Sequence, residues 1–196
     1  METKQDLFNY YKNALTNGIC NEYKDRWRAC GTSKDALVKL VMEQQSIPHF
    51  ITYCHNGMGV SKEYILENFK EYINGNTKIN DADGVHGYTY GLYVAFKGVF
   101  KADMDVLACL WCSNTTIEIK TAKSPVIYVG ANSHVNLSLC GYNCPRVYLF
   151  DESTVNIDES DENSNVIIYL YSDKANVYLG KYCLAKTKIF NKELKL

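Results

Sequence analysis

The chain has 196 residues, a formal net charge of −1 and 46% hydrophobic residues. This composition predicts a folded protein with a sizeable core, and the near-zero charge argues against broad electrostatic binding to nucleic acid. No apolar run reaches the roughly 18–20 residues that a membrane-spanning helix needs, and the charged start METKQDLFNYYKNAL lacks the apolar core of a secretory signal. We therefore expect a cytoplasmic protein with free thiols, without a membrane partner.

Residues 1–75 have the periodicity of short helices. Thr32 begins a capping-box pattern for the third helix, which Pro48 is expected to end. Ser61 is expected to cap the fourth helix, and Gly75 to end it in a left-handed conformation. The expected core-facing stripes are Leu7, Tyr10, Tyr11 and Leu15; Ile19, Tyr23 and Trp27; Leu37, Leu40 and Val41; and Ile65, Phe69, Tyr72 and Ile73.

From about residue 106 the apolar period falls to two, and the sequence repeats every twenty residues. The rows read VLACLWCSNTTIEIKTAKSP, VIYVGANSHVNLSLCGYNCP, RVYLFDESTVNIDESDENSN and VIIYLYSDKANVYLGKYCLA, with the first strand of the fourth row shifted by one to 168–170. Such a period, with short strands, is typical of a β-solenoid whose coils stack about 4.8 Å apart. We therefore expect an α+β protein in which a helical domain, residues 1–80, packs on a parallel β-helix-like solenoid of about four coils, residues 81–196.

Residues one period apart should lie above one another in such a solenoid. Asn136, Asn156 and Asn176, which continue from Thr116, are expected to form a ladder of hydrogen-bonded amides along one flank. The expected inward positions are Ile127, Val129, Val135 and Leu139, with a second-strand core column of Ile117, Leu137, Ile157 and Val177. The expected corner column is Ser113, Ser133, Ser153 and Asp173.

Tyrosine is the candidate binding residue of this chain, which has sixteen tyrosines and seven phenylalanines. The alternation predicts an outward column of Tyr128, Tyr148 and Tyr169, and Tyr171 and Tyr178 add aromatic surface near the C-terminal end. Tyrosine rings give contact area at low entropic cost, so we assign these five residues to partner binding. The alternative is that the rings only stack along the ladder.

A solenoid has two open ends, and each is a sheet edge that can pair with another chain. The helical part is expected to cover the first end. In the last coil, KTKIFNKELKL alternates lysine with apolar residues, and lysine is a common blocker of sheet edges. An incomplete cap at this end would instead form a homo-oligomer contact.

The cysteines CLWC (Cys109, Cys112) and CGYNC (Cys140, Cys144) have the spacing of zinc knuckles. In a solenoid the two pairs should lie at different corners, and Cys109 and Cys112 would face opposite ways within one strand. We therefore expect buried or corner thiols, with no metal and no cofactor.

The segment PHFITYCHNG contains the remaining candidates for catalysis. Cys54 could form a nucleophile–base pair with His49 or with His86, because its chain neighbour His55 is poorly placed to face it. No hydrolase motif accompanies these residues, so a loop that packs between helices is the preferred interpretation, and an enzyme is the least favoured one.

The run SIPHFITYCHNGMGVSKEYILENFKEYING, followed by DGVHGYTYGLYV, resembles small uncharacterised proteins of gut Bacteroides species and their phages. In those proteins a helix with the pattern S-x-E-Y-I…F-x-x-Y-I-N-G precedes a glycine–tyrosine segment and short β repeats. The resemblance covers residues 30–100 and implies a phage or mobile-element origin, without an activity or site residues.

Three functional hypotheses follow from these observations. The first is a non-enzymatic module that binds another protein, in its concrete form a phage inhibitor of a host defence protein such as a CRISPR effector. The second is a structural or assembly component of a phage particle, which uses the solenoid end for contacts. The third is an enzyme with a Cys/His pair.

Overall fold

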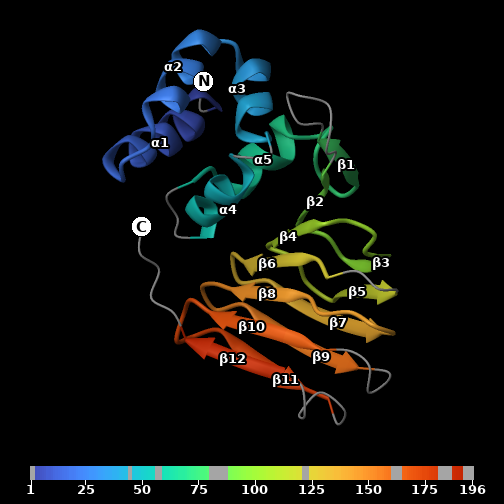
Figure 1. Ribbon diagram of the computed structural model, residues 1–196. Coiled ribbons are helices and arrows are strands. Elements are labelled where there is room, and N and C mark those ends of the chain that lie inside the picture. Colours follow the sequence, from blue (N-terminus) through green and yellow to red (C-terminus); the bar gives the residue numbers. More distant parts are fainter. Residues whose placement is uncertain are drawn as a thin grey trace. The chain divides into compact units, whose positions relative to one another are not determined.

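The computed structural model describes residues 3–43, 46–55, 59–79, 88–120, 124–159, 165–180 and 187–191 (Figure 1). The chain forms two compact units, a helical unit within residues 1–72 and a solenoid unit within residues 73–195. The boundary was expected at residue 80. The observed boundary lies earlier, between residues 72 and 73, because residues 76–79 form a strand of the second unit. That the helical unit packs on the solenoid stays a prediction.

The described part of the helical unit contains five helices. They are α1 (Thr3–Thr16), α2 (Asn21–Cys30), α3 (Lys34–Val41), α4 (Ile47–His55) and α5 (Lys62–Asn68). In α1 the buried stripe is Leu7, Tyr10 and Ala14, each at most 2% exposed, whereas Leu15 is 41% exposed. The expectation for Leu15 was wrong because each residue turns the helix by about 100°, which carries Leu15 away from the stripe centred on the other three.

Of the three residues predicted to begin or end a helix, Ser61, Thr32 and Gly75, one has the expected role. Ser61 caps α5, since its Oγ accepts a hydrogen bond from the Tyr64 amide at 3.2 Å. The cap of α3 is Ser33 and not Thr32, with Ser33 Oγ accepting from the Ala36 amide at 3.3 Å. After α5 the left-handed residue is Asn74, with φ 57°, in place of the expected Gly75.

The segment expected to be a loop between helices is helix α4. Pro48 is its second residue, a position in the first turn where the missing amide hydrogen costs nothing. Pro48 therefore helps to begin a helix, and the interpretation of it as the end of the preceding helix was wrong. The Phe50 ring lies 5.5 Å from that of Tyr10 and 5.4 Å from that of Phe69, which ties α4 to α1 and to the end of α5.

The solenoid unit is built from two sheets. Sheet A has the strand order β1-β2-β4-β6-β8-β10-β12, and sheet B has the order β11-β9-β7-β5-β3. Sheet A comprises β1 (Asn76–Ile79), β2 (Tyr88–Val94), β4 (Val106–Leu110), β6 (Val126–Gly130), β8 (Arg146–Leu149), β10 (Val166–Leu170) and β12 (Thr187–Asn191). Sheet B comprises β3 (Gly98–Lys101), β5 (Thr115–Lys120), β7 (His134–Cys140), β9 (Thr154–Glu159) and β11 (Asn176–Leu179).

Successive coils stack in the order of the sequence, as the colours from green to red show in Figure 1. β1 pairs antiparallel with β2, and the other described strand pairs are parallel. This confirms the β-solenoid of about four coils. One shorter turn, formed by β2 and β3, precedes the predicted repeat, with Tyr90 in register with Val106.

The register confirms the twenty-residue period through the first three rows. The one-residue shift in the fourth row is also confirmed, since Ile168 pairs with Val147. In sheet B, however, Val177 pairs with Val155, and Leu179 takes the place beside Ile157. The fourth row therefore contains two more residues before its second strand than the period predicts, and Val177 lies one inward position away from the expected core column.

Side-chain alternation places the apolar residues between the two sheets. Every predicted inward residue of β6 and β7 is at most 2% exposed: Ile127, Val129, Val135, Leu137 and Leu139. The first corner of the four coils from β2–β3 to β8–β9 has a left-handed residue, a column formed by Ala95, Trp111, Ala131 and Asp151 with φ between 50° and 53°. At these corners the chain turns from sheet A toward sheet B, and the backbone strain of a non-glycine residue there is offset by the core on either side.

Candidate protein-binding surface

Five aromatic residues form two columns on the outer side of sheet A. Tyr148 stacks between Tyr128 and Tyr169, with ring centroids 5.2 and 4.7 Å apart. Beside them Phe150 stacks on Tyr171, with centroids 5.0 Å apart and an interplanar angle of 7°. We call these five rings the aromatic face. Four of them were predicted from the sequence, whereas Phe150 was missed. It follows Tyr148 in the outward alternation but is only 4% exposed, so it supports the Tyr171 ring and adds little surface of its own.

The geometry of the aromatic face follows from the parallel register. Tyr128, Tyr148 and Tyr169 are directly paired residues of β6, β8 and β10, so their rings are spaced by the distance between strands. Burial raises the pKa of the Tyr128 and Tyr148 hydroxyls above their ordinary value, and the neighbouring phenols add to the effect. Tyr128 and Tyr148 therefore stay uncharged at neutral pH, and the face consists of flat rings, of which the four tyrosines carry a hydroxyl group at the tip.

The structure does not bring Tyr178 together with the other predicted binding residues. It lies in β11 of sheet B, in register with Asn156, and is 61% exposed. The five tyrosines expected to bind a partner are therefore divided between two sheets. Tyr178 can take part in a different contact, but it is not a member of the aromatic face.

The asparagine ladder contains two of its three expected members. Asn156 Nδ2 donates to Asn136 Oδ1 at 2.8 Å, and Asn136 Nδ2 donates to Thr116 Oγ1 at 3.5 Å. Asn176 lies outside this ladder: it pairs with Thr154, and its Nδ2 donates to the Lys174 carbonyl at 2.9 Å. The reason is that the last coil contains two residues more than the period of twenty, so that Tyr178 and not Asn176 lies beside Asn156. The two bonded amides serve the stacking of the coils, as expected.

Cys109 and Cys112 both lie in the core, and the expectation that they face opposite ways was wrong. The left-handed residue Trp111 ends the strand between them, so the alternation does not continue to Cys112. A hydrogen bond to Cys112, together with burial, raises the pKa of Cys109. Cys140 lies at the surface. In the part of the chain that the structure describes, no three His, Cys, Asp or Glu side chains are grouped to hold a metal ion.

The geometry around Cys54 does not suit a nucleophile. The side chain is 5% exposed, and burial raises the pKa of its thiol to about 12. Gly59 packs so closely on it that a Cβ atom there would lie 2.8 Å from Cys54 Sγ. His49 is exposed on the same helix, five residues before Cys54, and His86 lies outside the described residues.

Comparison of the chain with protein families, with curated proteins and with solved structures found no match. Among the helices within the described ranges, none has both the length and the apolar character needed to cross a membrane. The fold and the surface together define the chain as a β-solenoid protein with a helical N-terminal unit.

Proposed function

We propose that this chain is a non-enzymatic protein-binding module and that its aromatic face contacts the partner. The observation that carries the proposal is the pair of aromatic columns on one sheet, with Tyr148, Tyr169 and Tyr171 partly exposed. Protein interfaces are enriched in tyrosine and phenylalanine and depleted in charged residues at their centre. A preformed array of stacked rings also loses little conformational freedom when a partner binds.

The partner expected for such a face has an apolar or arginine-containing surface, since aromatic rings attract both. A narrower form of the proposal is that the chain is a phage or mobile-element inhibitor of a host defence protein such as a CRISPR effector. This form is supported by the resemblance of residues 30–100 to proteins of Bacteroides and their phages.

Replacing Tyr148, Tyr169 and Tyr171 together by serine is expected to weaken partner capture more than about tenfold, because clustered aromatic residues carry most of the binding energy of an interface. The measurement is a pull-down from a Bacteroides lysate with wild-type and variant chains, followed by titration of the captured protein. Tyr178→Ser is the matched control, since it removes an exposed tyrosine from the other sheet.

Urea unfolding of the same variants separates binding from stacking. If the triple variant loses stability but captures the partner as wild type does, the rings only stabilise the coils and the proposed interface is wrong. A stable triple variant that has lost the partner, beside a Tyr178→Ser variant that keeps it, would support the proposal.

A second candidate function is self-association through the C-terminal end of the solenoid. Ile189 of β12 is in register with the fully buried Ile168, yet it is 50% exposed. An inward residue that stays exposed favours a contact with a second copy.

Ile189→Lys is expected to remove concentration-dependent assembly on a sizing column with light-scattering detection, because a charge would have to be buried in the contact. Lys188→Ala, one residue earlier in the same strand, is the control. A wild-type chain that stays monomeric at all concentrations would contradict this second candidate.

A further inference from the structure

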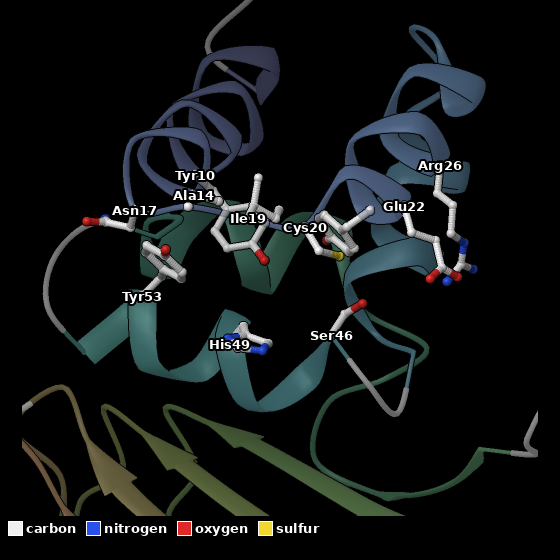
Figure 2. A pocket seen from close by; sticks show the side chains of 12 residues that line it. Tyr10, Ala14, Asn17, Ile19, Cys20, Glu22, Arg26, Ser46, His49 and Tyr53 are labelled. Atoms are coloured by element: carbon white, nitrogen blue, oxygen red, sulfur yellow. The ribbon is translucent and has the colours of Figure 1, made fainter. Parts of the chain in front are cut away.

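The helical unit contains a cavity of about 390 Å³, a size within the usual range of small-molecule sites. Figure 2 shows its lining side chains, which come from α1, α2, the segment between them, Ser46 and α4. This site could not be predicted from the sequence, because Ser46, His49 and Tyr53 are distant in the chain from the lining residues of α1 and α2, and the local pattern does not show that they meet.

Tyrosine rings form the apolar part of the lining. Tyr10 and Tyr53 meet edge to face, with ring centroids 5.5 Å apart and an interplanar angle of 88°. Trp27 packs against Tyr10, with ring centroids 6.0 Å apart. Such a wall is held in place by packing and favours a flat aromatic ligand, which can add a further edge or face contact.

Tyr23 supplies a buried polar group on the same lining. Its hydroxyl oxygen is shielded from solvent and lies near the hydroxyls of Tyr10 and Ser46. Within the described chain it makes no hydrogen bond of standard geometry. The Tyr10 and Ser46 hydroxyls act on this oxygen through contacts outside standard hydrogen-bond geometry, so a ligand donor at standard distance would improve its hydrogen bonding.

The charge of the lining favours a cation. Arg26 is neutralised, since its Nη2 donates to both carboxylate oxygens of Glu43. Among the lining residues the carboxylate is Glu22, which is exposed at the start of α2 and also acts on Arg26, so the group of Glu22, Arg26 and Glu43 has one net negative charge. His49 lines the cavity as well, from α4. A protonated amine can therefore reach Glu22 while remaining partly in water.

We propose that this cavity binds a small aromatic amine, with its ring against Tyr53, the less buried of the two tyrosines, and its ammonium group toward Glu22. A ring N–H or hydroxyl of the ligand donates to Tyr23 Oη. The site is independent of the aromatic face, because it lies within the helical unit.

The probes are tryptamine and indole-3-acetate, which share the indole ring and carry opposite charges. Titration of the ¹⁵N-labelled full chain is expected to shift the amides of Gly18, Ile19 and Cys20, with a Kd for tryptamine between about 0.05 and 1 mM. Indole-3-acetate is expected to bind at least about threefold more weakly.

Two variants test the assigned roles. Glu22→Gln is expected to weaken tryptamine about threefold and to remove its advantage over indole-3-acetate, whereas Glu67→Gln, an exposed carboxylate of α5 outside the cavity, leaves both unchanged. Tyr23→Phe is expected to weaken the binding of both probes about fivefold without loss of fold, because it removes only the hydroxyl.

The proposal is overturned if neither probe shifts the cavity amides up to its solubility limit, or if wild type binds the acid as tightly as the amine.

Discussion

Replacing Leu137 by alanine is expected to lower the free energy of unfolding of the solenoid unit by about 3 kcal/mol. Leu137 is 2% exposed and lies between Ile117 and Ile157, its register partners in the coils on either side. The parallel backbone hydrogen bonds hold these strands in place, so the cavity left by the smaller side chain closes only in part. Urea unfolding followed by far-ultraviolet circular dichroism gives the value.

Val99→Ala is the control for this substitution. Val99 lies in β3 of the same unit but is 62% exposed, so its shortening is expected to cost less than about 0.5 kcal/mol. If both substitutions cost the same, the interior between the two sheets would not be the main source of stability, and the assignment of inward and outward faces would be wrong.

Replacing Ser133 by alanine is expected to cost about 2 kcal/mol, although it removes a single oxygen atom. Ser133 is fully buried at a coil corner, and its Oγ accepts from the Cys112 amide at 3.0 Å. The same hydroxyl donates to the Gly130 carbonyl at 2.6 Å, across the left-handed turn of Ala131 and Asn132. Alanine would leave the buried Cys112 amide without an acceptor, which is costlier than the mean value of a hydrogen bond.

Ser153 is a closely matched control, since it is the same residue at the same corner one coil later. It is also fully buried, but its Oγ has no hydrogen-bond partner within the described part of the chain. Ser153→Ala is therefore expected to be neutral to within about 0.5 kcal/mol, or stabilising. An equal loss at both corners would indicate that the volume of the serine, and not its hydrogen bonds, matters here.

The corner column illustrates what the repeat could and could not predict. Ser133 and Ser153 were placed at one corner because they are twenty residues apart, and the register confirms that they stack. Asp173, also twenty residues on, is displaced, because Asn176 pairs with Thr154 and Ala175 thus follows Ser153 in the column. The period alone cannot show such a shift, since a coil can lengthen at a corner without a change in the alternation of its strands.

Most of the aromatic face was also predicted from the sequence. Tyr128, Tyr148, Tyr169 and Tyr171 lie together as expected, because the one-residue shift at 168–170 was visible in the sequence. Tyr178 was expected to add aromatic surface near the C-terminal end, and it is exposed there, but it lies in β11 of sheet B and is separate from the aromatic face. Phe150 joins the face through its stacking on Tyr171.

The sequence by itself determined the class of fold, since a two-residue alternation repeated every twenty residues can bury its apolar side chains only when successive coils stack. The tertiary structure decided which outward side chains meet, where the last coil shifts, and that Tyr10, Tyr23 and Tyr53 surround a cavity. The physical reason is that alternation is a local property of the chain, whereas register, corner conformation and cavities depend on contacts between distant residues, and several arrangements of these contacts satisfy the same local pattern.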